Sequence, residues 1–200
     1  MKKTSTLIMM ALAFATTAYA GGEKTPIDKE KTVIHWVGKK VTGQHSGFLN
    51  LAKGYLAVEN GNIIGGDFSI DMNTITVTDL KDKKMNASLT GHLKSDDFFS
   101  VEKHPYASFA ITKVEKLSKE GENGETHQIT GNLTIKGITN SISFPAKISM
   151  DGKEVTAQAN LSIDRTKWNV RYGSGSFFDD LGDKMIYDDI DLNIVLKTKG

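Results

Sequence analysis

Histidine and aspartate are the side chains of this sequence to consider first for acid–base chemistry or metal binding. None of the five histidines forms a His-x-x-x-His pair, and the chain has no cysteine to act as a thiol nucleophile. His92, Asp96 and His104 have the side-chain types that bind zinc, but their spacing does not require them to meet. His104-Pro105 is more typical of the start of a strand, where proline is tolerated. We therefore expect no metal site.

Two segments near the C-terminus contain further residues of catalytic or metal-binding type. The segment from Gly173 to Ser176 lacks the Gly-x-Ser-x-Gly pattern of a hydrolase, and no strand–helix unit surrounds it as a dinucleotide site would need. The aspartates between 179 and 191 lack EF-hand spacing and are more typical of a solvated acidic edge, which discourages pairing between strands. The sequence predicts no catalytic residue and no cofactor, so we expect a protein that is not an enzyme.

The first twenty residues have the features of a secretory signal peptide. Lys2 and Lys3 precede an apolar stretch, Leu7 to Phe14, that is too short to span a bilayer as a helix. Ala18-Tyr19-Ala20 is a small-x-small cleavage pattern. We expect residues 1–20 to be a signal peptide, residues 21–200 to be one domain, and the protein to be periplasmic or secreted. A retained membrane anchor is the alternative.

Charge and cysteine content limit the classes of partner and the sources of stability. The formal net charge is +1, and loss of Lys2 and Lys3 with the signal peptide would make it −1. No long basic run is present, so we expect no nucleic-acid partner. Without disulfides the fold must be stabilised by a hydrophobic core, which a chain of this length can bury.

Alternation of apolar and polar residues with period two dominates the rest of the chain and predicts β-strands. Ile129 to Ile135 is the clearest example. The dipeptides Asn60-Gly61, Lys136-Gly137 and Asp151-Gly152 predict tight turns, because glycine adopts the positive φ of such turns. We expect eight strands, at about 31–41, 46–58, 62–72, 106–116, 127–136, 140–150, 154–164 and 186–198.

Two segments lack this alternation. In residues 79–99, four apolar residues have helical spacing: Leu80, Met85, Leu89 and Leu93. Ser95-Asp96-Asp97 then resembles a helix N-cap followed by acidic residues in a first turn. Residues 165–186 are rich in Gly, Ser and Asp and predict a long loop. The pairs Phe98-Phe99 and Phe177-Phe178 lie in these two segments, which we expect to cover one end of the fold.

Eight antiparallel strands in hairpin order predict an all-β, up-and-down barrel with a short helical insertion. A barrel of this size is either filled by side chains or holds one small ligand. Several inward positions carry small residues, which favours a cavity: Gly131, Ala146, Ala157, Ala159, and Ala107 or Ala110. A barrel packed solid, acting as a stress-related protein-interaction module, is the alternative.

Three sequence blocks in the same order resemble those of the YceI-like family of bacterial periplasmic, polyisoprenoid-binding proteins. They are His92–Phe99 with His104–Phe109, then Gly131–Thr139, then Ile163–Val170. The resemblance implies an eight-stranded antiparallel lipocalin-like barrel that holds a long isoprenoid chain, such as a polyprenyl phosphate or a quinone, along its axis. The family commonly carries a histidine near Gly38-Lys39-Lys40, which this chain lacks.

The resemblance and the apolar alternation together give a predicted ligand-binding set and a predicted role as carrier or store. Arg165 or Lys94 would meet a polar head group, and transient membrane contact and a homodimer are both compatible with the sequence. The predicted ligand-binding residues are Trp36, Phe68, Ile70, Phe99, Phe109, Leu133, Ile135, Phe144, Ile148, Ala157, Leu161, Arg165 and Trp168.

Overall fold

The computed structural model describes residues 22–199, so the predicted signal peptide lies outside the described residues. One α-helix, α1 (Lys83–Lys94), accompanies three short 3-10 turns at Met72–Thr74, Arg165–Trp168 and Gly182–Lys184. The strands are β1 (Glu23–Pro26), β2 (Val33–Lys40), β3 (Gly43–Glu59), β4 (Asn62–Asp71), β5 (Tyr106–Lys116), β6 (His127–Ile135), β7 (Ile138–Asp151), β8 (Glu154–Asp164) and β9 (Ile186–Lys197).

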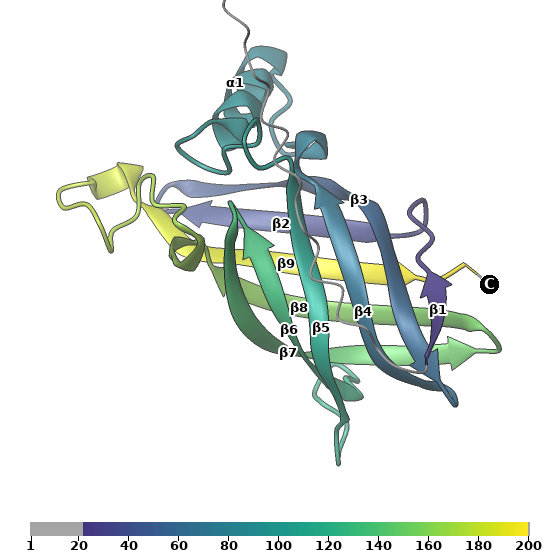
Figure 1. Ribbon diagram of the computed structural model, residues 1–200. Coiled ribbons are helices and arrows are strands. Elements are labelled where there is room, and N and C mark those ends of the chain that lie inside the picture. The colour runs from purple at the N-terminus through teal and green to yellow at the C-terminus, as the bar shows by residue number, and fades with distance from the viewer. Residues whose placement is uncertain (1–21, 200) are drawn as a thin grey trace, which may run out of the picture.

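Strands β2 to β9 form a closed antiparallel barrel, as predicted (Figure 1). Each strand pairs with the next along the chain, and β9 returns to pair with β2, where Trp36 lies opposite Leu192. The alternation read in the sequence sets which side chains point inward, since a closed sheet has one inner and one outer face. The predicted bounds of β5 and β8 coincide with those observed.

The short strand β1 was not predicted. β3 is 17 residues long and extends beyond its partner β2, so the second half of β3 has an edge that β2 does not cover. β1 occupies that edge, with Lys24 opposite Ala57. Ile27 then bridges to Thr198, just after β9. The four residues of β1 are too few to show an alternation, and their extended form is set by this pairing.

The tight turns lie where glycine predicted them. Asn60 and Gly61 have φ angles of 49° and 73°, and Lys136 and Gly137 have 50° and 73°. Positive φ at both central residues is the type I′ geometry that matches the twist of a hairpin. These turns fix the register of β3 with β4 and of β6 with β7.

Helix α1 begins earlier than the cap pattern indicated. Asp82 is its N-cap, and the Asp82 side chain accepts a hydrogen bond from the Met85 backbone N–H at 2.8 Å. Ser95 was predicted to be an N-cap, which is wrong. Its hydroxyl donates instead to the carbonyl of His92 at 2.8 Å, at the end of α1. A serine can satisfy either the donors that start a helix or the carbonyls that end one.

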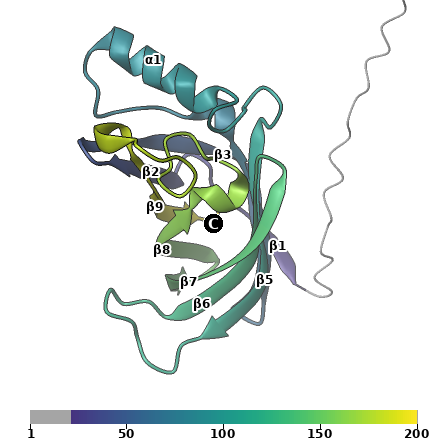
Figure 2. The same cartoon turned by 90° about the vertical axis from the view of Figure 1, so that its left-hand side faces the viewer.

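Helix α1 and the segment between β8 and β9 lie at the same end of the barrel, where β2 ends and β9 begins (the α1 end). Figure 2 looks toward this end, with α1 above the ring of strands and the β8–β9 segment in front of it. Leu93 of α1 is buried beside Trp36, whereas Met85 is 59% exposed. The helix thus packs against the barrel along one side only. No helix within residues 22–199 is long and apolar enough to cross a membrane.

Candidate functional site

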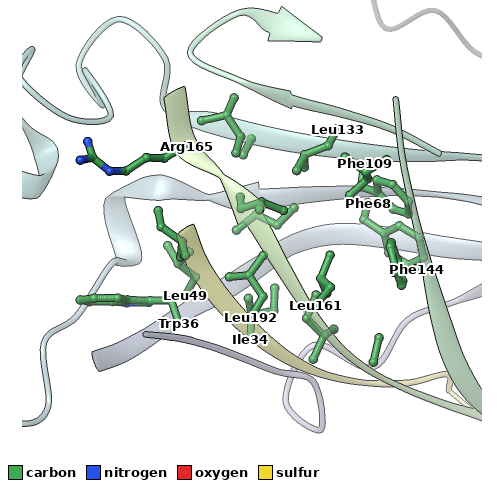
Figure 3. Close-up of a pocket in the computed structure, with 18 of the residues that line it drawn as sticks. Ile34, Trp36, Leu49, Phe68, Phe109, Leu133, Phe144, Leu161, Arg165 and Leu192 are labelled. Carbon is green, nitrogen blue, oxygen red and sulfur yellow. The ribbon is translucent and has the colours of Figure 1, made fainter. Parts of the chain in front are cut away.

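The barrel encloses an apolar cavity of about 250 Å³. This volume is slightly below the ~300–1,000 Å³ that is typical of small-molecule pockets. Each of the eight barrel strands contributes inward side chains to its lining, which is almost wholly carbon (Figure 3). One lining residue from each strand in order is Ile34, Leu49, Phe68, Phe109, Leu133, Phe144, Leu161 and Leu192.

Three phenylalanines, one each from β4, β5 and β7, form one part of the lining. The rings of Phe68 and Phe109 have centroids 6.3 Å apart, and those of Phe109 and Phe144 are 5.7 Å apart. A Cβ at Gly131 would lie 2.4 Å from Cζ of Phe109, so the glycine leaves space for that ring to lie over β6. Gly131 therefore makes room for the Phe109 ring and not for a ligand. The small side chains that line the cavity are those of Ala107, Ala146, Ala157 and Ala159.

Trp36 dominates the other part of the lining, which Figure 3 shows on the opposite side from the phenylalanines. Its partner across the strand pair is Gly47, where a Cβ would lie only 1.8 Å from the carbonyl oxygen of Thr76. This glycine lets residues 75–78 lie against β3, with the Thr76 N–H donating to the Phe48 carbonyl at 3.0 Å. Ile75 and Val77 then pack on Trp36.

Arg165 lies at the same end of the cavity as Trp36, and it is only 2% exposed (Figure 3). Its guanidinium donates to the carbonyls of Val170, Ile186 and Tyr187 at 2.8, 3.1 and 3.1 Å. Its Nη2 also lies 3.4 Å from Oδ1 of Asp188. Burial lowers the pKa of Arg165 and outweighs the opposite effect of nearby carboxylates. The side chain holds the two ends of the β8–β9 segment together, and each of its three guanidinium nitrogens donates to a backbone carbonyl.

The rim at the α1 end carries several polar residues of the lining, among them Lys39, Lys40 and His45. Lys39 forms an ion pair with Asp191 at 2.6 Å on the outer side of β9. Nδ1 of His45 lies 2.7 Å from Oδ2 of Asp79. Burial acts to raise the pKa of Asp79, but its hydrogen bonds with Ser46 and His45 prevail and lower it. Two of these three rim side chains, Lys39 and His45, are therefore each paired with a carboxylate.

Every residue of the predicted ligand-binding set lines the cavity except Trp168. Trp168 is 1% exposed and packs against Leu133 and Ile163, with its indole N–H bonded to the Leu133 carbonyl. Phe99 lines the cavity together with Phe98, as expected for a covering segment. Phe177 and Phe178 do not, since they are 45% and 51% exposed on the β8–β9 segment.

The structure adds lining residues that the predicted set lacked. Those from β2, β3 and β9 include Ile34, Leu49, Leu51, Ile190, Leu192, Ile194 and Leu196. The apolar face of β9 is visible in the sequence as an alternation. Its pairing with β2, which brings both strands to the cavity, depends on closure between distant parts of the chain.

The polar groups that were considered for metal binding do not meet. His92 pairs with Asp97 at 3.1 Å, and Asp96 pairs with Lys103 at 2.6 Å. Within residues 22–199, no three His, Asp or Glu side chains are close enough together to hold a metal ion.

Comparison with known proteins gives one family and several relatives. The YceI-like domain matches residues 26–198. A UPF0312 protein of Pectobacterium carotovorum is 35% identical over 43% of this chain, and one of Pseudomonas aeruginosa is 28% identical over 77%. These matches span 42% and 76% of the relatives' own lengths, so this chain matches less than half of the Pectobacterium protein.

Solved structures show the same fold at low sequence identity. BcnA of Burkholderia cenocepacia superposes with a TM-score of 0.66 at 21% identity, covering 86% of this chain and 99% of that one. A polyisoprenoid binding domain from Saccharophagus degradans, implicated in plant cell wall breakdown, has a TM-score of 0.64 at 12% identity. The superposition covers 88% of this chain and 97% of that domain.

Proposed function

This chain belongs to the YceI-like family, and on that premise we propose that it binds an isoprenoid-type lipid in the barrel cavity. The observation that carries the proposal is the cavity itself, enclosed by eight strands and lined almost wholly by carbon. Such a lining offers few groups that could orient a polar substrate. It matches the surface of a prenyl chain, and a neighbour of the same fold is described as a polyisoprenoid binding domain.

Burial of the prenyl chain supplies the binding free energy in this proposal. Each methylene or methyl group removed from water contributes about 0.8 kcal/mol. The ordering of a flexible chain offsets part of that gain. Because the cavity is small, we expect it to hold one part of a long lipid, with the remainder passing the rim at the α1 end. We further propose that the protein acts in the periplasm as a carrier or store, consistent with the sequence of residues 1–20.

Mass spectrometry of an organic extract tests the proposal. The protein is purified after export, extracted with organic solvent, and its lipid quantified against protein. We expect a prenyl lipid close to one molecule per protein, absent from the cavity-filled variant Ala157→Trp. A clean extract, followed by no uptake of added polyprenol, would contradict the proposal.

A further inference from the structure

We propose that the ammonium group of Lys40 binds the anionic head group of the lipid, a phosphate or diphosphate, at the rim of the cavity. This inference deepens the proposed lipid-binding function and rests on it. It assigns one cation and one chemical class to the polar end of a lipid whose head group the fold alone leaves open.

The inward face of β2 changes from apolar to open toward the α1 end. Ile34 and Trp36 are buried there, and because side chains alternate along a strand, Gly38 and Lys40 follow on the same face. Both line the cavity. A Cβ at Gly38 would lie 3.9 Å from Cζ3 of Trp36, and one at Gly43, opposite Lys40 on β3, would have nothing within 4 Å. This part of the rim therefore has room for a lipid chain to pass over Gly38.

Lys40 is also the basic side chain of the lining that the protein leaves without a partner. Four basic residues line the cavity: Lys39, Lys40, His45 and Arg165. Lys39 and His45 each pair with a carboxylate, and Arg165 donates to three backbone carbonyls. Within residues 22–199, Lys40 alone of the four makes no hydrogen bond or ion pair. Lys94 donates to a backbone carbonyl and does not line the cavity.

The position of this cation favours an anionic ligand group over a neutral one. An ammonium group has three donors and no acceptor, and it binds phosphate as a point charge. Lys40 is half-buried and lies two residues beyond Gly38, which is about 7 Å along a strand. A phosphate beside it keeps part of its hydration and avoids the large cost of burying an unpaired charge. A hydroxyl or quinone carbonyl would gain less from the same contact, because hydrogen bonds between two charged groups are stronger.

The contact also sets the direction of the ligand. With its phosphate at Lys40, the chain passes Trp36 and extends toward Phe68, Phe109 and Phe144, which lie on the opposite side of the cavity from Trp36 (Figure 3). The inference therefore favours a prenyl chain short enough for its phosphate to remain at the rim.

Affinities of two lipids with the same prenyl chain test the head-group contact. Geranylgeranyl phosphate and geranylgeraniol are each used to displace a polarity-sensitive dye from the parent protein, Lys40→Gln and Lys39→Gln. We expect Lys40→Gln to weaken the phosphate about tenfold and the alcohol hardly at all. Lys39 is the matched control, because its ammonium pairs with Asp191 on the outer side of β9, and Lys39→Gln should affect neither lipid. Added salt should weaken only the phosphate.

Gly38→Leu tests the route over the rim. Gly38 does not have a positive φ and a Cβ there has space, so we expect the variant to fold, as circular dichroism would show. Its side chain should obstruct the entrance and slow the association of both lipids in stopped-flow measurements. Val37→Leu, on the outer face of β2, should leave the association rate unchanged. A folded Gly38→Leu protein that binds at the parental rate overturns the route.

The remaining outcomes separate the head-group contact from lipid binding as such. Equal weakening of both lipids by Lys40→Gln, or a parent protein that binds the alcohol as tightly as the phosphate, overturns the anionic class. We expect inorganic phosphate not to displace geranylgeranyl phosphate. Displacement as effective as that by the lipid itself would assign the site to free phosphate and overturn the head-group contact. Failure of both lipids to bind the parent protein would instead refute lipid binding itself.

Discussion

The indole Nε1 of Trp168 donates a hydrogen bond to the carbonyl oxygen of Leu133 at 3.0 Å, which joins the 3-10 turn after β8 to strand β6. Leu133 lines the cavity, whereas Trp168 packs beside it and does not. The pair shows how the end of the barrel is stabilised by a residue that the sequence pattern suggested for ligand contact.

Replacement of Trp168 by phenylalanine should reduce stability without removing ligand binding. It deletes a buried hydrogen bond and part of a fully buried ring, so we expect a loss of about 2–3 kcal/mol in the free energy of unfolding. Urea denaturation measures this loss, with the exposed Phe178→Ala as the matched control. A Trp168→Phe protein of unchanged stability and weakened lipid affinity would restore Trp168 as a ligand contact.

Arg165 should behave as a structural residue and not as the head-group contact. In Arg165→Met the carbonyls of Val170, Ile186 and Tyr187 lose their donor and Asp188 loses its counter-charge. Removal of one partner of a buried ion pair costs about 3–5 kcal/mol, and we expect a loss in that range by urea denaturation. The half-buried Lys94 donates a single hydrogen bond to the Asn73 carbonyl, at 2.7 Å, so Lys94→Met should cost clearly less stability than Arg165→Met. An Arg165→Met protein as stable as the parent, but without affinity for lipid, would contradict this role.

Ala157 tests the cavity, because its side chain faces inward between Ile148 and Leu196. We expect Ala157→Trp to fill the space and abolish binding of a polarity-sensitive dye and of polyprenol. Thr156→Trp places the same ring on the outer face of β8 and should bind normally. Circular dichroism must show that both variants are folded. Full binding by a folded Ala157→Trp protein would be incompatible with a ligand inside the barrel.

His127 should make stability depend on pH. Burial, and then the charge of Lys116, lowers the pKa of His127 below its ordinary value. The unfolded chain therefore takes up a proton at a higher pH than the folded protein, so stability is lost as the pH falls below about 6.5. We expect the urea midpoint to fall from pH 7.5 to pH 5, and to fall less in His127→Gln. Identical pH dependence in the variant and the parent would rule out this contribution.

Much of the barrel could be predicted from local sequence patterns. Alternation marked the strands because a closed sheet separates an inner from an outer face, and glycine marked turns such as Asn60-Gly61 that need positive φ. The same alternation identified inward residues such as Phe68, Leu133 and Leu161, which line the cavity.

Features that depend on contacts between distant segments could not be predicted from the sequence. β1 is a strand because it pairs with the part of β3 that extends beyond β2. Trp168 lies outside the cavity, where its indole N–H donates to the carbonyl of Leu133, 35 residues away in the chain. Phe177 and Phe178 are exposed on the β8–β9 segment, whose ends Arg165 holds together. Residue type alone does not distinguish an aromatic ring that covers a cavity from one that faces water.

The pairing of β2 with β9 has a consequence for how the protein folds. Val33 lies opposite Val195, so the ring closes between strands from opposite ends of the described chain. Until β9 is in place, β2 and β8 are open edges that can pair with strands of other molecules. Closure over such sequence distances is slow. The chain is thus exposed to aggregation until the ring closes, and a chaperone that shields strand edges would act before β9 pairs with β2.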